Sequence, residues 1–193
     1  MGYPYSEIEK YADSFKKGDV IIEIGGDRGE GSSAFLKEFA QRYGLEFHSI
    51  DIDARVYGNM RLYEGVHTHG ADGAEWLKGF DKKIKFAYLD NYYWLFSPES
   101  PGANLEVLKT IYDMKPKTNN RDSRKAHLDQ AKALDKLADK PCFVIFDDTW
   151  KTPRGWDGKG GTAAPWLLKH GWKAINKPIV GESVDAYVFM RKG

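Results

Sequence analysis

The stretch that most constrains the fold runs from Asp19 to Ser33 and joins an apolar run to a glycine-dense turn. Val20 to Ile24 has the residue types of a buried strand, and a helical pattern follows the turn. The glycines of the turn are Gly25, Gly26, Gly29 and Gly31. Glycine permits backbone conformations that a side chain forbids, and it lets main-chain N–H groups approach a ligand. The stretch predicts the first strand, binding loop and first helix of an α/β sheet, with Glu23 at the strand's end.

The composition is that of a soluble globular chain with one domain, residues 1–193. The residues are 41% hydrophobic and 30% charged, and the net charge of +1 argues neither for nor against a polyanionic partner. The single cysteine, Cys142, excludes an intrachain disulfide and lies in an apolar run, which indicates a buried residue. No apolar run approaches the ~20 residues of a membrane span, and the first residues do not resemble a signal peptide. We therefore expect a cytoplasmic protein.

Strand and helix patterns alternate along the chain. Helices are predicted over residues 6–17, 35–43, 105–112, 123–138 and 163–170, and a further helix begins at Asp72. Ser32 or Ser33 is the expected N-cap of the helix over 35–43. Strands are predicted over 20–24, 45–50, 66–69, 84–89, 142–146, 172–177 and 184–191. Alternation predicts a mainly parallel sheet with helices on both faces. The last two strands are too close for a helix between them and should form an antiparallel hairpin. Residues 96–122 are interpreted as an insertion over the ligand cleft, and residues 149–166, loop as far as 162, as a lid.

Acidic residues end the predicted parallel strands. They are Glu23, Asp51, Asp90, Asp147 and Asp148. In open α/β sheets, ligands bind outside the carboxyl ends of the strands, so five acids at equivalent ends predict a site there. Asp51, at the end of the second strand, is placed to bind a ribose diol, and turn chemistry is the alternative. Asp72 has the spacing of a helix cap with Glu75, and a capping residue at the cleft can also touch a ligand.

Together these features resemble the class I S-adenosylmethionine-dependent methyltransferases, over about residues 19–192. The sequence from Glu23 to Gly29 resembles the first motif of that family, Asp51 its ribose-binding acid, and Gly70 to Asp72 its adenine segment. The resemblance implies a Rossmann-like, seven-stranded methyltransferase fold whose last two strands are the antiparallel hairpin. It also implies S-adenosylmethionine as cofactor. The implied cofactor-binding residues are Glu23, Gly25, Gly26, Gly29, Ser32, Asp51 and Asp72.

Within that family, two segments resemble the metal-dependent O-methyltransferases of the catechol and macrocin types. These segments are Tyr88 to Asp90 and Phe146 to Asp148. In those enzymes the equivalent acids bind a divalent ion, so the resemblance implies Mg²⁺ at Asp90, Asp147 and Asp148. Such an ion lowers the pKa of a bound hydroxyl and orients it, and carboxylate oxygens suit Mg²⁺. The alternative is that Asp147 or Asp148 only caps the following turn.

The general base is not assigned by the resemblance. Catechol-type enzymes carry a lysine shortly after the strand-four aspartate, whereas this chain has aromatic residues at that place, Tyr93 among them. His127, His170 and Tyr93 are candidates by chemistry alone. Asp90 and Tyr93 are our candidate catalytic residues.

Two other interpretations compete. Gly29 to Ala34 fits the dinucleotide pattern G-x-G-x-x-G/A, but it starts late after the strand and gives Glu23 no role. The basic residues of 109–140, together with the tryptophans near residue 156, suggest a nucleic-acid methyltransferase or a silent binding module. We therefore expect Mg²⁺-assisted methyl transfer to an oxygen of a small molecule, without nucleic-acid or membrane partners. A homo-oligomer is compatible with the sequence.

Overall fold

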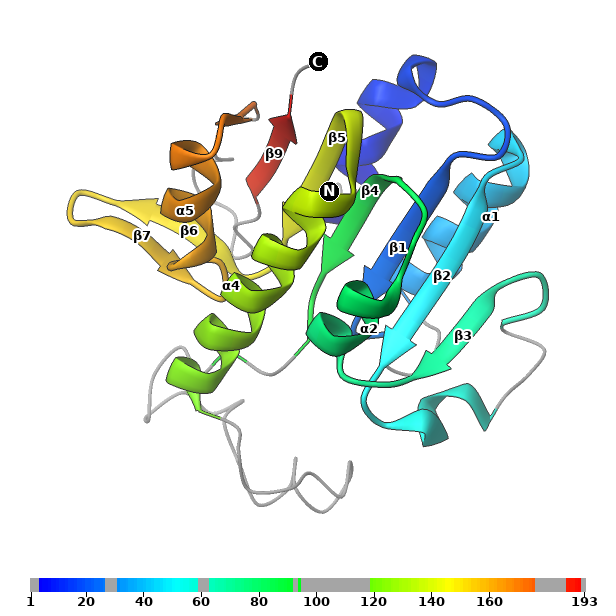
Figure 1. The fold of residues 1–193 in the computed structure, drawn as a ribbon, viewed down its shortest axis with the longest axis horizontal. Helices are drawn as coiled ribbons and strands as arrows, with labels where there is room; N and C mark the ends of the chain where they lie inside the picture. Colours follow the sequence, from blue (N-terminus) through cyan, green and yellow to red (C-terminus); the bar gives the residue numbers. More distant parts are fainter. Residues whose placement is uncertain are drawn as a thin grey trace.

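The computed structural model of the protein describes residues 4–26, 31–58, 63–91, 94, 119–175 and 187–191. Within them, seven strands form one sheet in the order β3-β2-β1-β4-β5-β9-β8, and helices cover both faces (Figure 1). Strands β1 to β5 pair in parallel, whereas β9 runs antiparallel to β5 and to β8. This confirms the predicted α/β architecture, including the antiparallel pair at the end.

The element bounds agree closely with the sequence patterns. The strands of the sheet are β1 (Val20–Ile24), β2 (Glu46–Asp51), β3 (His67–Gly70), β4 (Ile84–Leu89), β5 (Ala138–Phe146), β8 (Trp172–Ala174) and β9 (Tyr187–Arg191). The helices are η1 (Pro4–Ser14), α1 (Ser32–Tyr43), η2 (Ala54–Gly58), α2 (Gly73–Gly79), α4 (Asn120–Leu137) and α5 (Ala163–Lys169). Strands β6 (Thr149–Thr152) and β7 (Gly155–Gly158) form a second, two-stranded sheet.

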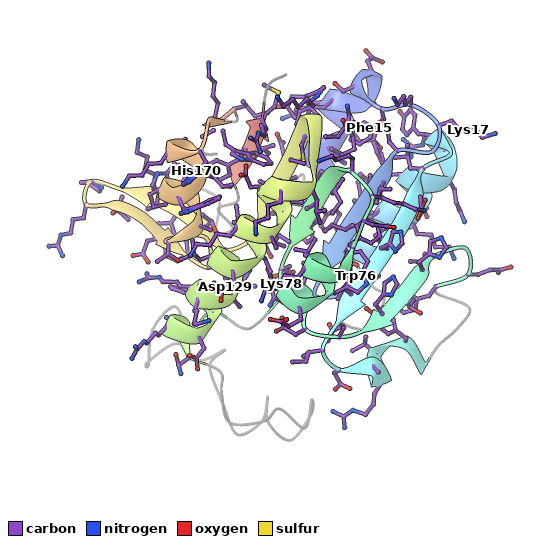
Figure 2. All side chains as sticks on the ribbon, in the orientation of Figure 1. Phe15, Lys17, Trp76, Lys78, Asp129 and His170 are labelled. Carbon is purple, nitrogen blue, oxygen red and sulfur yellow. The ribbon has the colours of Figure 1, made fainter. Side chains whose placement is uncertain are left out.

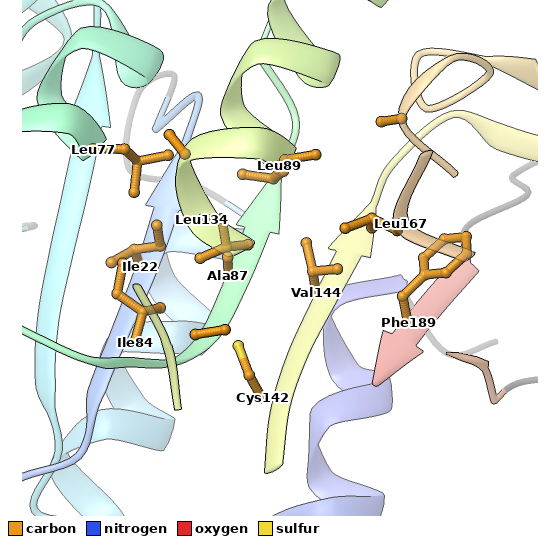
Figure 3. Packing of buried hydrophobic residues seen from close by; sticks show 14 of the residues in the cluster. Ile22, Leu77, Ile84, Ala87, Leu89, Leu134, Cys142, Val144, Leu167 and Phe189 are labelled. Carbon is orange, nitrogen blue, oxygen red and sulfur yellow. The ribbon is translucent and has the colours of Figure 1, made fainter. Parts of the chain in front are cut away.

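Successive side chains of β1 belong to two different cores. Ile21 packs with Phe39 of α1 on one face, whereas Ile22 packs with Leu77 of α2 and Leu134 of α4 on the other (Figure 3). Side chains alternate along a strand, so a strand covered on both faces favours apolar residues on both of them. All five residues of β1 are buried, and Glu23 is the one polar residue among them. This is why the central strands are mainly apolar in sequence.

One local prediction is wrong, and one predicted helix differs in type. Residues 149–162, predicted as loop, contain the antiparallel β6–β7 hairpin, in which Thr149 pairs with Gly158 and Thr152 with Gly155. The hairpin is short and rich in glycine and tryptophan, so its strands do not show an alternating apolar and polar pattern. Backbone pairing between β6 and β7 defines them instead. The first helix is of the 3₁₀ type and is kinked at Tyr11.

Several predicted features lie outside the described residues. These are Gly29, Tyr93, the insertion up to residue 118, and residues 176–186 between β8 and β9. Among the described residues, no helix combines the length and the apolar character that a membrane crossing requires.

Candidate functional site

The carboxyl ends of β1, β2, β4 and β5 are joined by backbone hydrogen bonds at the lower edge of the sheet in Figure 1. The amide of Gly25 donates to the carbonyl of Ile50 over 2.8 Å. The amide of Asp90 donates to the carbonyl of Ile24 over 2.9 Å. The amide of Asp147 donates to the carbonyl of Leu89, the last residue of β4, over 3.1 Å. The strand order reverses between β1 and β4, which is where ligands bind in such sheets. The predicted acids therefore share this edge.

Gly25 is required where β1 meets β4. Its φ is +101°, a conformation that L side chains rarely adopt, and a Cβ there would lie 2.7 Å from the backbone nitrogen of Asn91. The loop after β1 therefore touches the backbone that carries Asp90. The predicted cofactor loop and the predicted acidic cluster are in direct contact through this glycine.

Glu23 is completely buried and accepts three serine hydroxyls. Ser32 and Ser33 donate to its two carboxylate oxygens over 2.5 Å each, and Ser49 donates over 3.3 Å. Burial raises the pKa of Glu23 to about 7, although the serine hydrogen bonds act in the opposite direction. Glu23 thus ties the start of α1 to the sheet. The expectation that Ser32 or Ser33 caps α1 is wrong, because Gly31 holds the N-cap position without a side-chain hydrogen bond.

A pair of tyrosines covers the glycine loop. The hydroxyl of Tyr63 donates to the carbonyl of Gly26 over 3.1 Å, and the ring of Tyr57 meets that of Tyr63 edge-on at 4.9 Å. A Cβ on Gly26 would lie 2.5 Å from the hydroxyl of Ser49. The described part of the loop is therefore a close-packed cradle made for glycine.

Asp51 and Asp72, the other predicted cofactor-binding residues, both have the structural roles that were the alternative interpretations. A carboxylate oxygen of Asp51 accepts the amide of Asp53 over 2.8 Å, as in turn chemistry. Asp72 caps α2 and accepts the amides of Ala74 and Glu75 over 2.9 and 3.0 Å. Asp51 ends β2, which neighbours β1, and Asp72 follows β3, the next strand along the sheet. Their contacts with a ligand remain predictions.

The structure brings the predicted acidic cluster together. Asp90, Asp147 and Asp148 each offer a carboxylate oxygen, and these oxygens lie within 4.8 Å of one another. Burial, and then the charge of Asp90, raises the pKa of Asp147 well above its usual range. Asp148 has a φ of +45°, which is unusual for a residue other than glycine. Strain of this kind is typical of functional sites.

The cluster contains a cation, Lys159, that the sequence patterns did not predict. Nζ of Lys159 lies 2.5 Å from Asp90 and 3.0 Å from Asp148, and its side chain is only 4% exposed. Burial lowers the pKa of this ammonium, but the surrounding aspartates outweigh burial and raise it above its usual value. Three carboxylates are a donor set that suits Mg²⁺. As the residues lie, however, the set fits an ammonium and not a divalent ion, because two of the three carboxylates already bind Lys159.

Neither of the two histidines that were candidate general bases presents an exposed ring at the acidic cluster. His127 of α4 is fully buried and donates from Nδ1 to the carbonyl of Ser123 over 2.8 Å. Burial, with the charge of Lys159, lowers the pKa of His127 to about 4. His170 is exposed at the end of α5, where it stacks on Trp166, away from the lower edge of the sheet (Figure 2).

Comparison with solved structures identifies the fold. An rRNA methylase from Streptococcus thermophilus matches with a TM-score of 0.62 at 10% identity, over 100% of this chain and 99% of that chain. A putative methyltransferase from Streptococcus mutans, in complex with S-adenosylhomocysteine, gives 0.59 at 9% identity over 98% of both chains. The chain has the class I methyltransferase fold. No family model matches the sequence, and no curated protein matches it significantly.

The acceptors named for similar folds differ widely. An amino pentose methyltransferase from Micromonospora echinaspora, with bound S-adenosylmethionine, gives a TM-score of 0.55 at 11% identity, over 99% of this chain and 92% of that one. Sugar and rRNA enzymes therefore share this methyltransferase fold. At such identities the likeness shows the fold alone, so the acceptor must be argued from the site.

Proposed function

We propose that the protein transfers a methyl group from S-adenosylmethionine to an oxygen of a small-molecule acceptor. The observation that carries this proposal is the contact at Gly25, where the glycine loop after β1 meets the backbone of Asp90 and Asn91. A cofactor held by the loop would lie directly beside the acidic cluster after β4 and β5. The fold, which similar methyltransferases share, supports the same assignment.

The cofactor would be held on the β1–β2–β3 side of the site. Gly25 and Gly26 leave the backbone free of side chains, Asp51 ends β2 where a ribose diol would lie, and Asp72 starts the helix after β3. Ser32 stays a predicted contact, and its hydroxyl is engaged by Glu23. The described residues therefore offer a cradle and two carboxylates to the adenosyl group.

The acceptor would lie on the β4–β5 side. A carboxylate of the acidic cluster accepts a hydrogen bond from the acceptor hydroxyl and takes up the proton that methylation releases, with Asp90 as our first candidate. The acceptor oxygen then bonds to the methyl carbon, the carbon–sulfur bond breaks, and S-adenosylhomocysteine is left. Since the sulfonium is already activated, alignment of the two reactants supplies much of the catalysis.

The two alternatives from the sequence have less support. The antiparallel β9 between β5 and β8 is absent from a simple dinucleotide fold, which disfavours the oxidoreductase. The net charge of +1 does not favour a large phosphate footprint, as rRNA would require. An acidic cluster beside the cofactor loop would also repel a phosphate backbone.

Ligand binding to the purified protein tests the proposal. S-adenosylmethionine, S-adenosylhomocysteine and NAD are titrated by calorimetry into the wild type, Asp51→Ala and the control Asp53→Ala. Asp53 lies in the same turn but pairs with Arg55 on the surface. We expect micromolar binding of both adenosyl ligands, weakened about 10- to 100-fold in Asp51→Ala, as for loss of a hydrogen bond to a charged group, and unchanged in the control. Binding of NAD alone would refute the proposal.

A panel of acceptors then tests the reaction. Catechols, sugar diols and a short RNA are incubated with the protein and labelled S-adenosylmethionine. Methylation of a hydroxyl compound supports the proposed acceptor class. Methylation of RNA alone would replace that class with the nucleic-acid alternative.

A further inference from the structure

The acidic cluster contains its own cation, and this inference deepens the proposed function and rests on it. We propose that the ammonium of Lys159 takes the place of a divalent metal among Asp90, Asp147 and Asp148, so that the site works without a metal. The side chain is 4% exposed, and Nζ pairs with Asp90 and Asp148 over 2.5 and 3.0 Å. A solvated lysine that only passes the cluster would be neither so buried nor shared by two carboxylates.

The turn that carries Lys159 is fixed to the same acidic segment. The amide of Lys159 donates to the carbonyl of Asp148 over 2.8 Å, and the amide of Gly160 donates to the hydroxyl of Thr149, also over 2.8 Å. Gly158 has a φ of +81°, and a Cβ there would lie 1.9 Å from the carbonyl oxygen of Asp148. The β6–β7 hairpin thus returns the chain to the end of β5 and places the lysine.

Helix α4 holds the same turn from the other side. Arg124 donates from Nε to the carbonyl of Gly158 over 3.3 Å and forms an ion pair with Asp157. Its guanidinium also lies 5.0 Å from the ring of Trp94. Lys159 is therefore presented by a turn that is anchored at both ends, and not by a free loop. Moving it aside for an ion would disturb these contacts.

The chemistry of an ammonium suits this position. Three carboxylates within 4.8 Å of one another repel each other unless a positive charge lies between them. An ammonium has three N–H donors, and Asp90 and Asp148 engage two of them. The third is available to Asp147 or to the acceptor oxygen. Lys159 is thus a positioning residue that holds the carboxylates which receive the acceptor hydroxyl.

Metal binding by the protein alone tests this inference. Mn²⁺ is titrated and followed by electron paramagnetic resonance, without cofactor or acceptor, into the wild type, Lys159→Met, Lys159→Arg and Lys85→Met. Lys85 is the matched control, a lysine with a 7% exposed side chain that pairs with Asp139 away from the cluster. We expect no binding at about 1 mM Mn²⁺ to the wild type, Lys159→Arg or Lys85→Met. Lys159→Met should gain a Mn²⁺ site whose dissociation constant is at least tenfold below that concentration.

Several outcomes would overturn the inference. One is tight Mn²⁺ binding by the wild type that Asp148→Asn abolishes, and another is no gain of binding in a folded Lys159→Met. If Lys159→Met does not fold, the wild-type titration and Lys159→Arg decide. Activity gives a separate arm: methyl transfer should persist in EDTA. If no acceptor is methylated under any condition, the proposed function fails while the Mn²⁺ result still stands.

A second inference comes from the opposite end of the sheet, where β2 begins. Glu46 and His48 of β2 lie beside His67 and His69 of β3, and the register pairs His48 with His67. We infer that this group, here called the histidine edge, is a site for Zn²⁺ or a similar transition metal. Nε2 of His48 lies 2.7 Å from Glu46, and its Nδ1 lies 2.9 Å from Nε2 of His69. Ligand atoms of Glu46, His48 and His67 lie within 4.8 Å of one another.

Glu46 also pairs with Lys82 over 2.7 Å, but the Lys82 side chain is 53% exposed and can turn to solvent, unlike the buried Lys159. The donors and their surroundings then fit such an ion. Imidazoles with one carboxylate are typical of zinc, nickel and copper sites and unsuited to Mg²⁺. Alternate residues of β3 place both its histidines on one face, and the rings of Trp76 and Phe80 lie 5.4 and 5.1 Å from the ring of His48. His67 is exposed and gives the ion a route in. An ion here would join the edge strand β3 to β2.

Zinc titration tests the histidine edge. Calorimetry with Zn²⁺ is run on the wild type, on the double variant His67→Ala/His69→Ala, and on the control His170→Ala. We expect one site of micromolar or tighter affinity, weakened at least tenfold in the double variant and unchanged in the control and in Asp148→Asn. Absence of a site in the wild type, or a site that survives in the double variant, would overturn this inference.

Discussion

The two sides of the site accommodate their acidic residues in different ways. On the cofactor side, the described residues that donate side-chain hydrogen bonds to Glu23 are serines, and burial raises its pKa to about 7. On the acceptor side, Asp90 and Asp148 share the ammonium of Lys159. Hydroxyls satisfy hydrogen bonds but do not balance charge, whereas an ammonium does both. The cofactor side should therefore respond to pH, and the acceptor side to the loss of one cation.

Lys159→Met should give the largest effect on stability. Removing one partner of a buried ion pair leaves uncompensated charge, which costs about 3–5 kcal/mol. Lys85→Met is the control, because Lys85 is similarly buried but pairs more loosely, with Asp139 at 3.6 Å. Urea unfolding at pH 7.5 in EDTA measures both variants. Equal losses in the two variants would break the comparison, since the acidic cluster would then have no special need of a cation.

Glu23→Gln should remove a pH dependence from the cofactor side. The pKa of Glu23 is about 7 in the folded protein and 4.5 ordinarily, so the folded state keeps the proton longer. Its contribution to stability is complete below pH 4.5 and is lost as the pH rises through 7. The loss amounts to about 3 kcal/mol.

The free energy of unfolding, measured from pH 4.5 to 8 in the wild type and in Glu23→Gln, checks this. As the pH rises, the free energy of unfolding of the wild type should fall relative to that of Glu23→Gln. A difference that stays constant would show that the serine hydroxyls stabilise the charged form.

His127→Gln should remove the opposite pH dependence. Burial and Lys159 lower the pKa of His127 from 6.5 to about 4, so its contribution is complete above pH 6.5 and is lost as the pH falls through 4. The change is again about 3 kcal/mol. Unfolding of the wild type should weaken more steeply than that of His127→Gln between pH 6.5 and 4. Parallel curves would mean that His127 stays accessible to protons in the folded state.

Asp72→Ala should have the smallest effect on stability and should separate capping from ligand binding. Loss of the cap costs about 1 kcal/mol. Asn119→Ala is the control, because Asn119 caps α4 in the same way, through the amide of Asp122. Both variants should unfold slightly earlier, but only Asp72→Ala should weaken S-adenosylmethionine. If both leave the affinity unchanged, Asp72 is a cap and nothing more.

Local sequence patterns predicted the sheet and the acidic cluster at its carboxyl edge. The central strands β1, β4 and β5 are marked by mainly apolar residues. Asp90 and Asp147 directly follow β4 and β5, so aligning these strands brings the two acids together. Lys159 gave a weaker signal, a lysine between Gly158 and Gly160. It lies 69 positions from Asp90 along the chain, and only the unforeseen β6–β7 hairpin brings the two together. Burial and charge compensation of this kind depend on three-dimensional proximity, which a linear pattern does not record.

The serines after the glycine loop show the same limit. Ser32 lies where the sequence predicts the start of a helix, and local chemistry favours such a residue as a cap. The buried Glu23 competes for its hydroxyl, and the electrostatic demand of a buried carboxylate prevails. The sequence thus placed the residue correctly beside the loop but paired it with the wrong partner.

The position of β9 has a consequence for folding. This strand, formed by residues late in the chain, lies between β5 and β8 rather than at the edge of the sheet. Until it arrives, β5 presents an open edge of unpaired backbone groups beside the apolar side chains of Val144 and Ile145, which is a template for pairing with another chain. Aggregation should therefore threaten this protein most while its first five strands are formed and its last one is not. A chaperone that shields β5 during that interval should raise the yield of folded protein.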